Sequence, residues 1–437
     1  MNEMEKIRIV AQFLYEHNYE TTLKSLLNES GTEFVAESMV HKTGELELIL
    51  DEHYLQKNKT KSPLTLFDRF PKGDKLRHIL PSRVLWRIED MTCGKNVIVS
   101  RLRQDGTLFV AASDALLYKV NLGVELDKVA PDILTTIDKE MPLNEPLIKP
   151  LTPIPTTYNI HKGAILSIDI HPCHPDIIVS SSMDRSVAIC DTSLYPEDTN
   201  LIKQIFRDHV KYVVGVKWSP SGAYFASVGY DSELNVYFGS ISATYDTNFK
   251  KVFHETHKGA IEGIAFARHK DLLATCCRDD FLIHLYQMAV PPDGSDDTFS
   301  GGVSKVAEIN LNSLGDDFIS MTPMYVSFSP DDKHILVSTD RDRLIILSVE
   351  GGEVVATLYG ASSDGFSQPK NSWHESSAYI YGTSQDNTVC VWEVVSQKIV
   401  SKLNGHKGRI RDLQIVSYQE RQLMITGAFD ATVCIWC

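Results

Sequence analysis

Four polar side chains near the end of the chain, His406, Thr426, Asp430 and Trp436, have types and spacing that could do chemistry. A histidine, a hydroxyl and a carboxylate are the components of a hydrolytic triad, in which the imidazole takes the proton of the nucleophile. The same types recur upstream, as His161 with Ser180 and Asp184, His209 with Ser227 and Asp231, and His257 with Thr275 and Asp279. Because a catalytic site would not be repeated, the recurrence favours a structural network of hydrogen bonds.

The elements that position these side chains are short strands. From Gly405 to Cys437 the apolar residues alternate in three runs, with turn residues between the runs. The spacing between repeats is regular, because His161, His209 and His257 are 48 residues apart and the 149 residues from His257 to His406 equal three units of about 50. This periodicity predicts a protein built from repeated blades.

The repeat resembles the WD-repeat family, in which hydrogen bonds link the turn histidine, a Ser or Thr, the turn aspartate and a Trp. The resemblance implies a mainly β fold, a seven-bladed WD40 β-propeller over residues 83–437. Blade one is expected at 96–122. The turn aspartates of blades two to seven are expected to be Asp184, Asp231, Asp279, Asp342, Asp386 and Asp430. The Trp position is occupied by Cys190, Tyr237, Leu285 and Leu347 in blades two to five. Residues 83–88 are expected to supply the outer strand that the last blade lacks.

The N-terminal residues differ from the repeats. Apolar side chains at helical spacing, on both sides of a break near Tyr19, predict two short amphipathic helices: Ile7, Val10, Phe13, Leu14, Leu23, Leu26 and Leu27. Residues 1–35 resemble the LisH motif, which implies an α-helical module and homodimerisation through these residues and Tyr19. The alternative is a helical hairpin packed on its own propeller. Residues 36–82 are expected to form a helix at 45–54 and a linker, with a CTLH-like or coiled-coil extension left open.

Composition excludes several functions. No apolar run is long enough to span a membrane, and the N-terminus has no secretory signal, so we expect an intracellular protein, cytoplasmic or nuclear. A net charge of −14 argues against direct nucleic-acid binding. The eight cysteines show no CxxC pair or zinc spacing, and no phosphate loop or other enzyme motif is present. We therefore expect no enzyme, cofactor or metal. The alternatives are a cryptic hydrolase and a nucleic-acid-associated propeller.

Function must then come from a surface. The WD-repeat resemblance implies that the residues three and five places after each turn histidine, and the residue before each turn aspartate, face the propeller mouth. The main ones are Leu166, Met183, Tyr212, Val214, Tyr230, Glu262, Arg278, Arg409, Arg411 and Phe429. Lys217 and Asp332 are expected on the opposite face. The sequence thus predicts a scaffold that assembles protein partners into a complex of corepressor, splicing, ubiquitin-ligase or motor-regulator type. The other interpretation of the mouth is a solvated rim.

Overall fold

The computed structural model describes residues 10, 11, 14, 20–30, 70, 71, 80–129, 151–289, 301–312, 320–363, 368–419 and 421–437. The chain divides into two compact units, Met1–Arg69 and Phe70–Cys437. Each unit is described by itself.

The first unit contains helix α2 (Glu20–Ser30). Leu23 is buried and Leu26 and Leu27 are half-buried, whereas Lys24 and Ser25 are exposed, so the helix has one apolar face. Val10 and Leu14 are also half-buried. Ile7, Phe13, Tyr19 and the helix expected at 45–54 lie outside the described residues. The paired-helix module therefore stays a prediction. Among the described helices, none is both long and apolar enough to cross a membrane.

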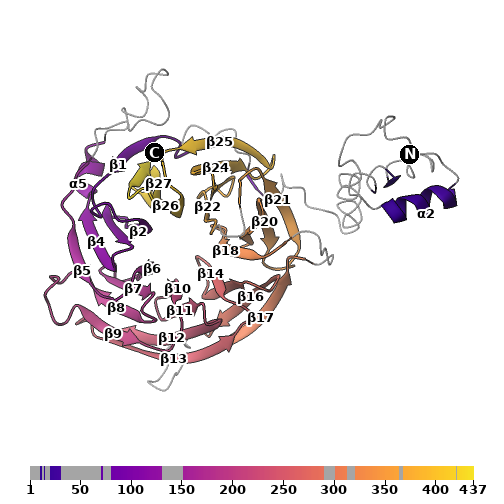
Figure 1. Ribbon diagram of the computed structural model, residues 1–437. Coiled ribbons are helices and arrows are strands. Elements are labelled where there is room, and N and C mark those ends of the chain that lie inside the picture. The colour runs from indigo at the N-terminus through magenta and orange to yellow at the C-terminus, as the bar shows by residue number, and fades with distance from the viewer. Residues whose placement is uncertain are drawn as a thin grey trace. The chain divides into compact units, whose positions relative to one another are not determined.

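The second unit is a ring of seven four-stranded antiparallel sheets, the blades, as Figure 1 shows. Blade one contains β2 (Val97–Leu102), β3 (Thr107–Ala112), β4 (Leu116–Asn121) and β5 (Thr156–Asn159). Blade two contains β6 (Ile165–Ile170), β7 (Ile177–Ser182), β8 (Val187–Asp191) and β9 (Ile202–Phe206). Blade three contains β10 (Val213–Trp218), β11 (Tyr224–Gly229), β12 (Glu233–Ile241) and β13 (Thr247–Thr256). In each blade the first of these strands lies nearest the axis of the ring.

The remaining blades repeat this order. Blade four contains β14 (Ile261–Phe266), β15 (Leu272–Cys277), β16 (Leu282–Met288) and β17 (Val303–Asn310). Blade five contains β18 (Pro323–Phe328), β19 (His334–Thr339), β20 (Arg343–Ser348) and β21 (Val354–Tyr359). Blade six contains β22 (Asn371–Trp373), β23 (Tyr379–Thr383), β24 (Thr388–Glu393) and β25 (Lys398–Asn404). A short helix, α5 (Gly123–Asp127), lies between β4 and β5 of blade one.

Blade seven is built from both ends of the second unit. Its strands are β26 (Ile410–Tyr418), β27 (Arg421–Ala428), β28 (Val433–Trp436) and β1 (Val84–Ile88). The outer strand β1 pairs antiparallel with β28, so that Trp86 lies opposite Ile435 and Ile88 opposite Val433. This pairing closes the ring and leaves no open edge on β28.

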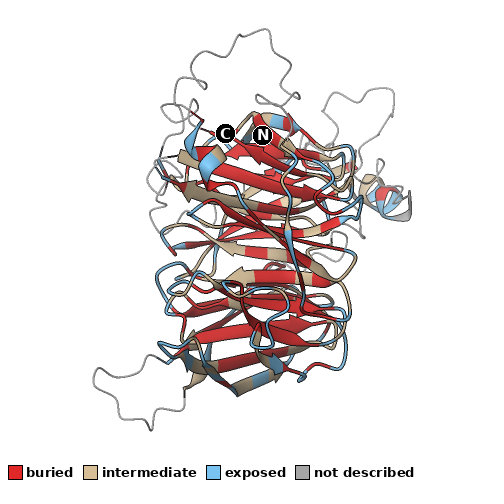
Figure 2. Cartoon of the chain, turned by 90° about the vertical axis from the view of Figure 1, so that its left-hand side faces the viewer, coloured by how far each residue is buried: buried red, intermediate tan, exposed pale blue. Residues whose placement is uncertain are grey.

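The hydrophobic core lies between neighbouring blades. Every residue of the middle strands β7, β11, β15 and β19 is buried, because each sheet is covered on both faces. Trp436 of blade seven, for example, belongs to the same buried cluster as Tyr379 and Tyr381 of blade six. Figure 2 shows these buried strands crossing the ring, with exposed residues in the loops at both edges.

The compact second unit begins before the first strand. The ring of Phe70 is stacked 6.0 Å from that of Trp373 and lies 4.5 Å from that of His334. Phe70 is therefore buried against blades five and six.

Candidate functional site: the mouth of the propeller

The repeated polar residues form a hydrogen-bond network in blade seven. His406 Nδ1 lies 3.3 Å from the Asp430 carboxylate, and its Nε2 lies 2.7 Å from the Thr426 hydroxyl. The Trp436 indole N–H donates to the same hydroxyl at 2.8 Å. Asp430 also accepts the backbone N–H of Lys407 at 2.7 Å. The network ties the turn to the second and third strands of the blade.

Blades two and three have versions of this network. His161 Nε2 lies 2.8 Å from the Ser180 hydroxyl and its Nδ1 lies 3.3 Å from Asp184. In blade three, His209 Nδ1 lies 3.0 Å from Asp231 and its Nε2 lies 2.8 Å from the Ser227 hydroxyl. Cys190 and Tyr237 occupy the places of the Trp, opposite Ile178 and Phe225.

Blade four departs from the prediction. His257 forms no hydrogen bond with Thr275 or Asp279, and its Nε2 instead lies 3.2 Å from the hydroxyl of Tyr286. Thr275 lies opposite His284, one residue further along the next strand than in blade seven, because this hairpin is one residue longer. Tyr286, and not Leu285, therefore occupies the Trp position.

The turn of blade five is also shifted by one residue. The backbone N–H of Asp340 donates to the Thr322 carbonyl, the same bond that Phe429 makes to Arg409 in blade seven. Arg341 therefore occupies the position of the turn aspartate. Asp342 is the residue after it, with a φ of 38°. The sequence assignment of Asp342 as the turn aspartate was wrong by one place.

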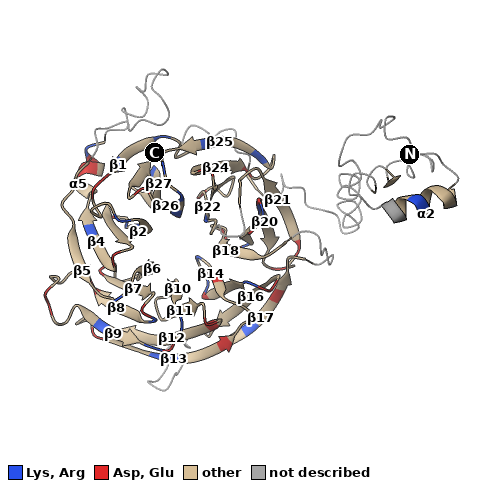
Figure 3. Ribbon diagram, viewed as in Figure 1, with Lys and Arg blue, Asp and Glu red and all other residues tan. Residues whose placement is uncertain are grey.

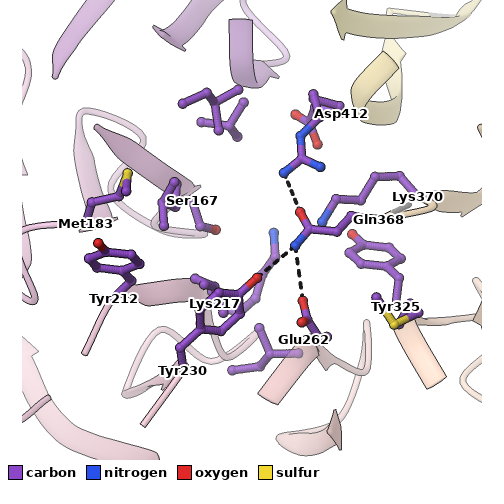
Figure 4. A pocket seen from close by; sticks show the side chains of 18 of the residues that line it. Ser167, Met183, Tyr212, Lys217, Tyr230, Glu262, Tyr325, Gln368, Lys370 and Asp412 are labelled. Carbon is purple, nitrogen blue, oxygen red and sulfur yellow. Dashed lines mark hydrogen bonds between the residues drawn. The ribbon is translucent and has the colours of Figure 1, made fainter. Parts of the chain in front are cut away.

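A pocket of about 280 Å³ opens between the inner strands at the axis of the ring, as Figure 4 shows. Seven of the ten predicted mouth residues line it: Leu166, Met183, Tyr212, Val214, Tyr230, Glu262 and Arg411. The others lie around it. Arg278 forms an ion pair with Glu262, Arg409 lines a neighbouring small pocket, and the exposed ring of Phe429 lies 5.3 Å from the Arg411 guanidinium.

Gln368 joins residues from three blades inside the pocket. Its side-chain N–H donates to the Tyr230 hydroxyl at 3.0 Å and to Glu262 at 3.3 Å. The Arg411 guanidinium donates to its carbonyl oxygen. These bonds are the dashed lines of Figure 4. They hold an aromatic, an acidic and a basic side chain in one arrangement at the mouth.

The charges in the pocket are only partly paired. Arg101 forms an ion pair with Asp412, Lys217 lies 2.8 Å from Asp169, and Glu262 is paired with Arg278. Arg411 and Lys370 form no ion pair with a carboxylate of the described residues. The buried Nε atom of Arg411 also has no hydrogen-bond partner there. The pocket therefore has an excess of positive charge within an acidic protein.

The environment of Lys370 changes its pKa. Burial lowers the pKa of Lys370 to about 8, helped by the nearby charges of Arg411 and Arg101 and opposed by Asp412 and Glu262. The ammonium lies 4.2 Å from the centre of the Tyr325 ring. Lys370 can therefore lose or keep its proton close to neutral pH.

Sequence reasoning missed part of this site. Ser167, Tyr325 and Asp412 line the pocket, and each follows a residue that also lines it. The inner strands have a register shift at this place, as between Ile410 and Asp412. A bulge turns two consecutive side chains towards the axis, where strict alternation predicts one. The expectation for Lys217 holds only in part: it lines a second pocket at the far ends of the inner strands, and it lines this pocket as well. The Asp332 carboxylate is buried and accepts backbone N–H groups of blade four.

Comparison with known proteins agrees with this architecture. The family model described as WD domain, G-beta repeat matches residues 153–191, 200–237 and 397–437. The chain thus contains WD40 repeats within a seven-bladed propeller.

Similar curated proteins include actin-interacting protein 1 of Drosophila melanogaster, 31% identical over 116 residues, which are 26% of this chain and 18% of that protein. Coronin-7 of Bos taurus is 34% identical over 77 residues, 18% of this chain and 8% of coronin-7. A WD repeat domain-containing protein 83 homolog of Dictyostelium discoideum is 27% identical over 111 residues, 25% of this chain and 33% of the relative. The chain spans at most a third of the length of these relatives.

Proposed function

We propose that the protein is a non-enzymatic scaffold whose propeller mouth binds a segment of a protein partner. The observation that carries the proposal is the axial pocket, in which Tyr212, Tyr230 and Arg411 surround one cavity. Tyrosine and arginine are enriched among the residues that dominate binding energy at interfaces. Tyr212 is 43% exposed and Met183 38% exposed, so apolar surface is available at the rim.

The charges of the pocket indicate the chemistry of that segment. Because Arg411 and Lys370 lack carboxylate partners among the described residues, an acidic side chain of the partner would pair with both. Figure 3 shows that outer strands such as β13 and β17 carry both basic and acidic residues. The unpaired positive charge at the mouth is thus a local feature, and it suits an acidic peptide.

The pocket offers no support for the hydrolase alternative. Among the described residues its lining contains no histidine and no cysteine, and the hydroxyl of Ser167 is bonded to the backbone carbonyl of Val216 at 3.4 Å. A serine nucleophile would need a base within hydrogen-bond reach. His406, which could act as a base, is bonded within its own blade.

The first unit would supply the oligomeric state. We propose that the apolar face of α2, with Leu23, Leu26 and Leu27, packs against a second copy of the chain, as the LisH resemblance implies. A short amphipathic helix cannot bury its apolar face alone. A dimer would present two propeller mouths and so hold two partners in one intracellular complex. The complex types named above remain the candidates.

Actin is a partner to be tested, because two of the similar proteins are named actin-interacting protein 1. The matched parts cover only 18% and 16% of those proteins, so the likeness supports the test and no more.

Affinity capture with a matched pair of variants tests the mouth. The full-length chain and its Tyr230→Ala, Arg411→Ala double variant are used as baits, with actin among the proteins quantified by mass spectrometry. We expect the double variant to lose its partners, since two truncated hot spots of about 2 kcal/mol each weaken binding roughly a thousandfold. Lys333→Ala is the control, because this side chain is 76% exposed in the β18–β19 turn, at the far ends of the inner strands. Partners that stay on the double variant but leave the control would contradict the proposal.

A further inference from the structure

Blade four contains a buried cluster of metal-ligand side chains away from the mouth. His257 precedes β14, Cys277 is the last residue of β15, and His284 lies in β16. A ring nitrogen of each histidine and the sulfur of Cys277 lie within 4.8 Å of one another. His257 is 8% exposed, His284 5% and Cys277 0%. Three donor atoms this close can converge on one ion after small side-chain movements.

The hydrogen bonding of His257 leaves one nitrogen available. Its Nε2 lies 3.2 Å from the Tyr286 hydroxyl, whereas its Nδ1 has no hydrogen-bond partner in the described chain. A bond at one ring nitrogen fixes the tautomer and directs the lone pair of the other, which is the usual arrangement of a metal-bound histidine. A buried imidazole nitrogen without a partner is otherwise costly.

The ring of His284 also has nitrogen atoms without a hydrogen-bond partner in the described part of the chain, and two carboxylates lie near it. Neither of its ring nitrogens meets a partner with hydrogen-bond geometry in the described part of the chain. The Glu308 carboxylate lies 3.4 Å from Nδ1, and that of Asp280 lies 3.8 Å from Nε2. The His284 and His257 rings meet edge to face at 4.5 Å. A carboxylate beside a ring nitrogen orients a ligating histidine and raises its basicity.

Cys277 lies beside a turn that lacks the carboxylate network of blades two, three and seven. In blades two, three and seven the turn aspartate accepts a backbone N–H from the residue after the histidine. In blade four no such bond joins the backbone N–H of Lys258 to Asp279 within the described residues, and the buried Cys277 sulfur lies within 4.8 Å of a ring nitrogen of His257.

We infer that blade four binds a zinc ion through His257, Cys277 and His284. A mixed set of imidazole and thiolate donors suits tetrahedral zinc, which takes neutral histidine and deprotonated cysteine. One thiolate together with the nearby Asp280 balances the charge of the ion. The ion links the turn before β14 to β15 and β16, the connection that hydrogen bonds provide in blade seven. The ligands come from three separate elements, so no short spacing in the sequence reveals them.

Metal analysis of the untagged full-length protein tests this inference. After dialysis against a weak chelator, the wild-type chain should retain about one zinc ion, and Cys277→Ser and His284→Gln should retain little. Cobalt in place of zinc should give a sulfur-to-metal charge-transfer band that Cys277→Ser removes. Cys276→Ser is the matched control, because Cys276 is equally buried but packs in the cluster on the other face of the sheet.

The wild-type protein provides a second test that needs no variant to fold. A strong chelator should lower the melting temperature of the wild-type protein, and added zinc should restore it. A wild-type protein that holds no zinc after dialysis, shows no charge-transfer band and melts at the same temperature with and without chelator would overturn the site. If Cys276→Ser and Cys277→Ser retain equal amounts of zinc, the bound ion is adventitious, and this result would also overturn the site.

Discussion

Arg101 of blade one and Asp412 of blade seven form a buried ion pair across the seam where the ring closes. The same Asp412 carboxylate accepts the backbone N–H of Ser100 at 2.7 Å. The inner strands at the seam, β2 and β26, thus meet through a charged contact, while the outer strand β1 pairs with β28. Blade seven is thus joined to blade one by the ion pair between their inner strands, and its outer strand is β1, the strand that precedes blade one in the sequence.

The closing strand should decide whether the propeller is stable. Deleting the chain through Ile88 removes β1 and exposes the edge of β28, together with the buried Val84 and Trp86 sites. We expect this truncation to unfold at a much lower temperature or to aggregate. Deleting only the first 60 residues should leave the melting temperature of the propeller nearly unchanged in calorimetry. Equal melting of the two truncated chains would contradict the role of β1.

The blade network gives a second prediction. Asp430→Asn should destabilise the protein by about 1–3 kcal/mol, because the buried His406 loses its charged partner and only one side-chain oxygen remains to accept the backbone N–H groups of Lys407 and Thr432. Asp279→Asn in blade four should cost less, because His257 forms no hydrogen bond with Asp279. Urea unfolding of both variants measures the difference. Equal losses would mean that the two networks are equivalent after all.

The contact between His406 and Asp430 predicts that the stability of the protein depends on pH. Burial lowers the pKa of His406, but the Cys434 sulfur and the Asp430 carboxylate outweigh burial and raise that pKa from 6.5 to about 9. A raised pKa means that the folded state favours the protonated ring. Its stabilisation is fully present below pH 6.5 and is lost as the pH rises through about 9. The difference in unfolding free energy between wild type and Asp430→Asn should therefore shrink from pH 6.5 to pH 9. A constant difference would show that His406 does not titrate in this range.

Dimerisation through α2 can be tested with two charges on one helix. Leu26→Asp places a carboxylate on the half-buried face, whereas Ser25→Asp places the same charge on the exposed face. Burying an unpaired charge in a helix interface costs several kcal/mol, so the first variant should run as a monomer in light scattering. The second variant should keep the mass of the wild type. A monomeric wild type would contradict the dimer itself.

The sequence predicted the parts of the structure that follow the repeat, and it did not predict the parts that depart from it. The period of the repeats predicted seven blades, and the histidine, hydroxyl and aspartate types predicted the network of blade seven, because both repeat along the chain. The added hairpin residue before Tyr286 and the shifted turn at Arg341 break that period, so their pairings required the structure. Gln368 and Lys370 lie just before β22, outside any alternating strand, and only the closed ring brings them to the axis.

Lys370 makes the mouth sensitive to pH, which gives the last prediction. Free in the pocket, this side chain has a pKa of about 8, and it faces Arg101, Arg411, Asp412, Glu262 and the ring of Tyr325. An acidic partner side chain would favour the protonated amine and raise this pKa, so binding would take up a proton. Affinity for a captured acidic peptide should then fall as the pH rises above about 8, by up to about tenfold per pH unit. Lys370→Arg should bind without this decline because a guanidinium stays charged, and Lys370→Gln should bind weakly at every pH. Isothermal titration in two buffers of different ionisation enthalpy measures the proton uptake directly. A wild type that takes up no proton and binds equally on both sides of pH 8 would show that Lys370 does not meet the acidic group.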